Sequence, residues 1–250
     1  MHVRRGLIVS VTALSVIAFL AAMPVTWCVR RMVLWVPRWL DQAERPSRPE
    51  MEVGSRWMPQ PMAHTGSSLG RGRMGVSFAM DGLAFSCLAA LFVLSVMAWG
   101  ATLQALTAMI LVSMLLALTW IDLETGLLPD VLTKTGLGLG LVINVWSVWV
   151  PWGDAVIGAL AGYWLMWLFF HLYLLATKKE GMGYGDFKLF AMLGAWFGWE
   201  SLAPILLVAA LAALTIASIG MVIKRWTLQS SLPFGPFLAF GGILRLFGWL

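Results

Sequence analysis

Two aspartates lie beside apolar runs, where their carboxylates could do chemistry. Asp186 follows a segment with glycine at three of five positions and precedes an apolar run, and Asp122 comes at the end of another apolar run. A carboxylate at the mouth of a membrane segment is costly, so it marks a candidate functional site. Two neighbouring carboxylates cannot both ionise cheaply, and they would share one proton. One could then act as a base toward water while the other polarises a peptide carbonyl, as peptide hydrolysis requires.

The glycines before Asp186 admit two interpretations. Gly181, Gly183 and Gly185 indicate a loop rather than a regular helix, and they would let an extended substrate backbone approach closely. Alternatively, Asp186 only N-caps the helix that follows, a role for which Asp is well suited. The second aspartate favours the functional interpretation.

The acids near Asp122 are weaker candidates for catalysis. Glu124 and Asp130 lie in the loop that follows, where solvated or capping roles are more common, and Asp130 comes directly after Pro129, where it could cap the next helix. Asp81 lies inside an apolar segment, where it is either hydrogen-bonded between helices or lines the site.

The remaining polar residues suggest no second site. Asp154 and Glu200 are interpreted as loop residues on the opposite face, and His171 is expected to hydrogen-bond to another helix. Cys28 and Cys87 form no CxxC pair, so they indicate neither a disulfide framework nor a metal site.

The composition is that of a membrane protein. Of the 250 residues 60% are hydrophobic and 12% are charged, and the mean hydropathy is +0.84. Soluble domains carry about 25% charged residues. The excess of 17 Lys and Arg over 12 Asp and Glu is explained by basic loops at a membrane surface, so the lipid bilayer is the expected partner and nucleic acid is not.

The apolar segments predict an all-α polytopic membrane protein with about eight transmembrane helices. Residues 1–37 hold the first span, which resembles a signal peptide but is long and lacks a clean cleavage site. Residues 38–77 form a polar loop, and residues 78–250 form the main transmembrane domain. Its expected spans are 78–98, 101–121, 135–150, 155–176, 187–199, 202–222 and 234–250. Three of them are shorter than the roughly 20 residues of a full span, which suits a site at the membrane surface.

The basic residues predict the orientation of the chain. When the loops are numbered alternately, all 17 Lys and Arg residues except Arg4, Arg5 and Arg245 fall on one side. The positive-inside rule places that side, with Asp122 and Asp186, in the cytoplasm.

Four motifs follow one another in the C-terminal two-thirds of the chain. They are Ile121-Asp122, Leu127-Leu128-Pro129-Asp130, Lys179-Glu180-Gly-Met-Gly-Tyr-Gly-Asp186-Phe-Lys188 and Pro233-Phe-Gly-Pro236. These motifs closely resemble those of the bacterial type IV prepilin peptidases, which are integral-membrane aspartic proteases of the GxGD type. The resemblance implies that Asp122 and Asp186 are catalytic. The supporting motif that it implies consists of Gly181, Gly183, Gly185, Pro129, Asp130, Glu180 and Lys188.

The resemblance also implies a substrate and a location. The substrates would be type IV prepilins or pseudopilins, whose basic leader would be cut at the cytoplasmic face of the inner membrane by a multi-pass enzyme that needs no cofactor for this reaction. Family members also methylate the new N-terminus with S-adenosylmethionine, and typical members bind zinc through two CxxC pairs in the first loop. Residues 38–77 contain no cysteine. No zinc is therefore expected, and whether methylation is retained stays open.

Two other kinds of protein share some of these features. Presenilin-like and signal-peptide-peptidase-like proteases also use a GxGD motif, but they have a Tyr-Asp pair where this chain has Ile121-Asp122. A transporter or channel could use the same aspartates as proton or cation ligands, but the sequence shows nothing that resembles broken-helix repeats.

Overall fold

The structure, a computed structural model, describes Ala22 and residues 70–178, 183–223 and 232–250. All regular secondary structure in these residues is helical, which confirms the all-α prediction for this part of the chain. The expected first span and most of the polar loop lie outside it. The elements are α2 (Gly70–Trp99), α3 (Leu103–Thr125), α4 (Asp130–Asn144), α5 (Trp152–Thr177), α6 (Tyr184–Phe197), the 3-10 turn η1 (Trp199–Ser201), α7 (Leu202–Val222) and α8 (Gly235–Leu246).

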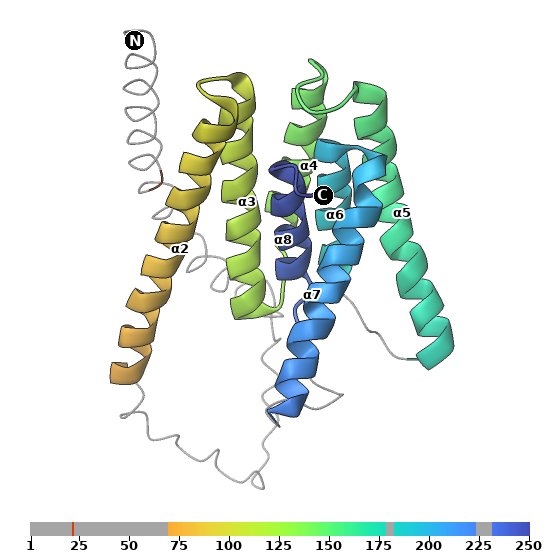
Figure 1. Ribbon diagram of the computed structural model, residues 1–250. Coiled ribbons are helices and arrows are strands. Elements are labelled where there is room, and N and C mark those ends of the chain that lie inside the picture. The colour runs from red at the N-terminus through yellow and green to blue at the C-terminus, as the bar shows by residue number, and fades with distance from the viewer. Residues whose placement is uncertain (1–21, 23–69, 179–182, 224–231) are drawn as a thin grey trace, which may run out of the picture.

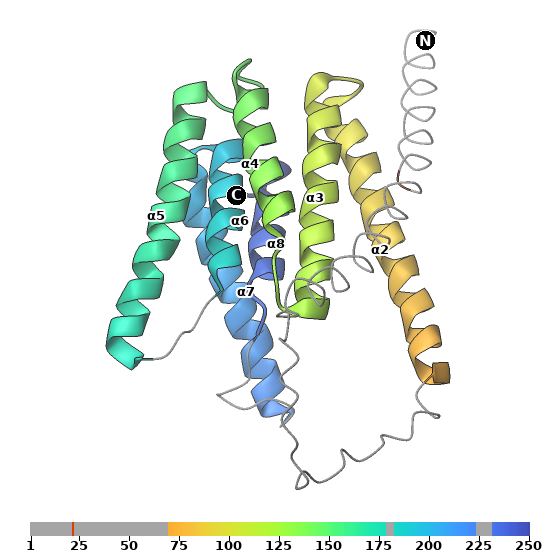
Figure 2. The same ribbon diagram turned by 180° about the vertical axis from the view of Figure 1, so that it is seen from behind.

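Successive helices run in opposite directions from α2 to α8 (Figure 1). The C-terminal end of α3 and the N-terminal ends of α4, α6 and α8 therefore lie together, at the lower end in Figure 1, and the view from behind in Figure 2 agrees. This is the alternation expected from the loops. It places Asp122, near the end of α3, and Asp186, near the start of α6, at the same end of the bundle.

Within the described part of the chain, three helices are long and apolar enough to cross a membrane, namely Leu103–Thr125, Trp152–Leu175 and Trp199–Val222. The expected short segments are also short in the structure, since α4 has 15 residues, α6 has 14 and α8 has 12. A total of eight spans stays a prediction.

Several helix boundaries differ from the expected spans, and among them the span expected at 101–121 continues to Thr125 and the one expected at 234–250 ends at Leu246. The helix expected at 78 begins at Gly70, and the span expected at 135–150 is helical from Asp130 to Asn144. Hydropathy marks only the apolar part of a helix, whereas the helical backbone continues into polar sequence. The start of α4 is set by Pro129, whose extended backbone precedes the first helical residue.

Helix α6 is the centre of the bundle, with every residue from Leu189 to Phe197 buried. It crosses α5 with backbone in contact, because a side-chain Cβ on Gly158 or on Gly194 would collide with the carbonyl oxygen of the other residue. Small residues at helix crossings permit this approach in membrane proteins. The short helix that carries Asp186 is therefore held tightly where its C-terminal half crosses α5.

A buried asparagine joins α4 to α6 at the end of the bundle opposite Asp186. The side-chain amide of Asn144 donates to the carbonyls of Ala195 at 2.9 Å and Trp196 at 3.1 Å. Its side-chain oxygen accepts from the backbone amides of Trp149 at 3.0 Å and Val150 at 3.3 Å. One side chain thus satisfies backbone groups from both α6 and the α4–α5 connection.

Candidate active site

Asp122 lies in the last turn of α3, and its side chain is buried, with 5% of the residue exposed. The helix ends three residues later because Gly126 adopts a left-handed backbone, φ 66°, and its amide bonds back to the Asp122 carbonyl at 2.8 Å. The Asp122 carboxylate accepts a hydrogen bond from the backbone amide of Gly235, with 3.1 Å between N and Oδ2. Gly235 is the first residue of α8, so a free helix-start amide and the positive end of a helix dipole face this carboxylate.

Asp186 is the third residue of α6 and is also buried, at 7% exposed. The interpretation of Asp186 as a mere N-cap is wrong, because Gly183 occupies that position and no side chain caps the helix. The expected loop through Gly185 is also wrong, since Gly185 is helical. A Cβ there would lie 2.7 Å from the Cβ of Leu128, so packing against Leu128 requires this glycine.

The two carboxylates are neighbours. The charge of Asp122 acts on Asp186, which places them within electrostatic reach. Leu128 lies between the helices that carry the site, since it contacts Gly185 on α6 and Gly235 on α8. Two buried acids within electrostatic reach of each other cannot both carry a charge cheaply, so the pair is suited to hold one proton.

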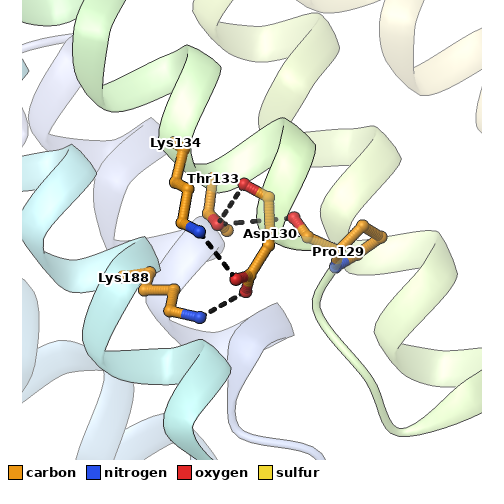
Figure 3. Close-up of polar contacts among 5 residues, drawn as sticks. All are labelled: Pro129, Asp130, Thr133, Lys134 and Lys188. Carbon is orange, nitrogen blue, oxygen red and sulfur yellow. Dashed lines mark hydrogen bonds and ion pairs between the residues drawn. The ribbon is translucent and has the colours of Figure 1, made fainter.

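Asp130 belongs to an ion-pair cluster beside this pair (Figure 3). The expectation that Asp130 caps α4 is wrong, because Pro129 is the N-cap and no side-chain cap bond forms. The Asp130 carboxylate instead pairs with Lys188 on α6 and with Lys134 on α4, the latter at 3.0 Å. Lys188, followed by Lys134, holds the pKa of Asp130 below its usual range. The hydroxyl of Thr133 donates to the carbonyls of Pro129 and Asp130, both at 3.3 Å.

The other predicted residues lie apart from the pair. Glu124 is exposed and accepts from the indole of Trp120 at 2.9 Å, as its expected solvated role suggests. The prediction that His171 hydrogen-bonds to another helix is wrong, because its Nδ1 lies 2.9 Å from the carbonyl of Trp167 on the same helix. Asp154 lies in the first turn of α5, at the opposite end.

Some of the residues that the sequence assigns to the site lie outside the described part of the chain. They include Glu180 and Gly181 of the supporting motif, and the side chain of Asp81 is not described either. Within the described residues there is no group of three or more His, Cys, Asp and Glu that could hold a metal ion.

Reasoning from the sequence singled out neither Gly235 nor Leu128 as part of the site. The only signal was their place within the motifs Pro233-Phe-Gly-Pro236 and Leu127-Leu128-Pro129-Asp130. Both residues act through a backbone amide or an apolar contact, and neither carries a side chain that sequence analysis associates with chemistry.

Comparison with known proteins gives a family match over part of the chain. Residues 109–218 match the type IV leader peptidase family, a segment that contains both aspartates and Lys188. The resemblance indicated by the motifs is thus confirmed, because this segment is similar to the type IV leader peptidase family. Together with the three long apolar helices, it indicates an integral membrane protein.

Several curated relatives carry the name prepilin leader peptidase/N-methyltransferase. One from Pseudomonas putida is 45% identical over 149 residues, 59% of this chain and 52% of that protein. One from Aeromonas salmonicida strain A449 is 49% identical over 149 residues, 59% of this chain and 50% of that protein. One from Pectobacterium carotovorum subsp. carotovorum is 45% identical over 164 residues, 66% of this chain and 56% of that protein.

The chain therefore spans about half the length of the curated relatives it matches. No solved structure matches it.

Proposed function

We propose that this chain, with its segment similar to the type IV leader peptidase family, is a membrane aspartic endopeptidase that cuts the basic leader from type IV prepilins or pseudopilins. The observation that carries the proposal is the meeting of Asp122 and Asp186, from α3 and α6, at one end of the bundle. The names of the relatives support the substrate class. They do not favour a presenilin-like protease or a transporter.

The surroundings of the two acids support a division of roles. The Gly235 amide and the start of α8 favour the charged form of Asp122, so we assign it as the base. Asp186, in the electrostatic field of that charge, holds the shared proton and acts as the acid. Both are buried, which strengthens their interactions with a bound peptide because little water screens them.

The hydrolysis then proceeds in two balanced steps. Asp122 takes a proton from water as the water oxygen bonds to the scissile carbonyl carbon, and Asp186 gives its proton to the carbonyl oxygen. When the tetrahedral intermediate collapses, Asp122 gives its proton to the leaving amine. Asp186 recovers a proton from the hydroxyl as the new carboxyl group forms, so both acids return to their starting states.

The orientation and location follow from the same reasoning. The end of the bundle that holds the acids also carries Lys134, Lys178 and Lys188, whereas Arg245 lies near the opposite end. By the positive-inside rule this end faces the cytoplasm of a bacterial cell, and the chain is a multi-pass protein of the inner membrane. A prepilin helix in the bilayer would then present its leader junction at the depth of the aspartates.

The decisive experiment is a prepilin mobility-shift assay in membranes. Asp122→Asn and Asp186→Asn should each abolish leader cleavage while the protein still inserts, because an amide cannot shuttle the proton. Glu124→Gln and Asp154→Asn are matched controls, at the same end and at the opposite end, and should retain most activity. Full processing by either Asp122→Asn or Asp186→Asn would refute the proposal.

Methylation of the new N-terminus is a separate proposal. The relatives are named N-methyltransferases as well, so S-adenosylmethionine would be the donor if this chain retains the activity. Residues 38–77 lack the cysteines that bind zinc in typical members. We propose that cleavage resists zinc chelators, and loss of cleavage on chelation would contradict this. Mass spectrometry of the processed pilin N-terminus would detect an added methyl group.

A further inference from the structure

The Asp130 carboxylate binds two lysines that have different structural consequences (Figure 3). Lys134 is one turn along α4, so its ion pair at 3.0 Å lies within a single helix. Lys188 is on α6, 58 residues away, and its ion pair joins the start of α4 to the start of α6. Only the second pair links two separate elements of the site.

The link to Lys188 reaches the turn of α6 that carries Asp186. Lys188 follows Asp186 by two residues, which places the two side chains about 200° apart around the helix. Asp186 is buried within electrostatic reach of Asp122, and Lys188 extends from a different face toward α4. Two attachments on different faces fix the rotation of a helix about its axis, whereas one attachment does not.

Phe187, next to Asp186, packs this turn of α6 against Tyr163 and Phe170 of α5, but no side chain caps the turn. Its N-cap residue, Gly183, offers no side chain, and no capping bond is made. On the apolar side, Leu128 contacts Gly185. Leu128 lies in the short connection between α3 and α4, and Asp130 is the first residue of α4, so this part of the chain reaches α6 at two points.

We propose that Asp130 is a positioning residue, whose ion pair with Lys188 holds the first turn of α6 so that Asp186 faces Asp122. The inference deepens the proposed peptidase function and rests on it. The pair is partly exposed, with side-chain exposure of 48% for Asp130 and 28% for Lys188. Such pairs contribute little to folding stability, whereas a misplacement of about 1 Å in an active site can cost on the order of a hundredfold in rate. The effect should therefore fall on turnover more than on stability.

The test measures cleavage of a prepilin by the full chain in membranes, with rates corrected for the amount of inserted protein. Asp130→Asn and Lys188→Gln should each lower kcat about tenfold or more, with KM changed less than about twofold. Lys134→Gln is the matched control, because it removes a lysine from the same carboxylate without breaking the link to α6. It should leave kcat unchanged. Lys188→Arg and Asp130→Glu retain the opposite charges and should restore most of the activity.

The double variant Asp130→Asn/Lys188→Gln should be no slower than the slower single variant, because both changes break one link. Three results would each overturn the inference. The first is a wild-type kcat in Lys188→Gln, and the second is an equal loss of kcat in Lys134→Gln and Lys188→Gln. The third is a loss of kcat in the double variant that equals the product of the two single losses.

Hydrogen exchange separates this inference from the proposed function. Amides of residues 183–190 should exchange faster in Lys188→Gln than in the wild type or in Lys134→Gln. If the wild type cleaves no prepilin, the proposed function fails, and this measurement still tests the link. Equal exchange in all three proteins would overturn the positioning role.

Discussion

The backbone amide of Gly235 donates to the Asp122 carboxylate at 3.1 Å, although the two residues are 113 positions apart in the chain. The bond joins the start of α8 to the end of α3. It gives Asp122 a hydrogen-bond partner for its carboxylate that, among the described residues, Asp186 does not have. A carboxylate that accepts from the first amide of a helix is stabilised in its charged form, because that amide has no partner within the helix. The asymmetry between the two acids therefore arises from a backbone group.

Gly235→Ala should reduce cleavage by about tenfold or more. A Cβ at this position would lie 2.6 Å from Oδ2 and 3.2 Å from Cγ of Asp122, so the carboxylate must shift. The measurement is the initial rate of prepilin processing in membranes at equal protein amounts. Gly138→Ala on α4 is the matched control, because a Cβ there would have no atom within 4 Å. Equal activity of the two variants would mean that Asp122 tolerates the displacement.

Asn144→Ala should destabilise the protein by about 2–4 kcal/mol, since each buried polar group that is left without a partner costs about 1–3 kcal/mol. The change removes the partner of two carbonyls and two amides at a fully buried position. Thermal or denaturant unfolding in detergent would measure it. Gln104→Ala loses one bond, to the Val148 carbonyl at 3.1 Å, and should cost about 1 kcal/mol. Similar losses in the two variants would contradict the role assigned to Asn144.

The ion pairs of Asp130 should stabilise the protein at neutral pH and weaken in acid. Lys188 and Lys134 lower the pKa of Asp130 in the folded state. A lowered folded-state pKa gives a stabilisation that is complete above the unfolded value, about 3.9, and is lost as the pH falls through the folded value. The stability difference between the wild type and Asp130→Asn should be at most about 1 kcal/mol, because the pair is exposed. It should stay constant from pH 8 to about pH 5 and shrink only in stronger acid. A difference that instead grew on acidification would contradict this assignment.

Cysteine labelling should place the acid pair on the cytoplasmic side. Leu127 is exposed beside the pair, and Trp152 is exposed at the opposite end of the bundle. After Cys28 and Cys87 are replaced by serine, an impermeant maleimide should label Trp152→Cys in intact spheroplasts and Leu127→Cys only in inverted vesicles. The prediction rests on the basic residues that gather at one end. Labelling of Leu127→Cys in spheroplasts would reverse the orientation and exclude a cytoplasmic site.

Much of the local structure was predictable because it follows from chain composition. Apolar runs long enough for a membrane helix predicted the helices, and the order of loops predicted that Asp122 and Asp186 share one end. The local roles of polar side chains were predicted less well. Asp130 and Asp186 were each plausible N-caps of the helices that follow them. In the structure the N-cap of α4 is Pro129 and that of α6 is Gly183. Capping depends on backbone angles at a single residue, and a sequence pattern fixes these only within a few positions.

The sequence by itself determined the resemblance to the type IV leader peptidases, the acid pair and the alternation of the helices, because residue types, motif spacing and hydropathy are properties of the chain. Only the tertiary structure decided which partners those residues have. Gly235 faces Asp122, Leu128 fills the space against Gly185, and Asp130 binds Lys188 across two helices. These contacts join segments that are far apart in the sequence. Their formation depends on how α3, α4, α6 and α8 pack, and close packing is a property of matched surfaces that no single segment encodes.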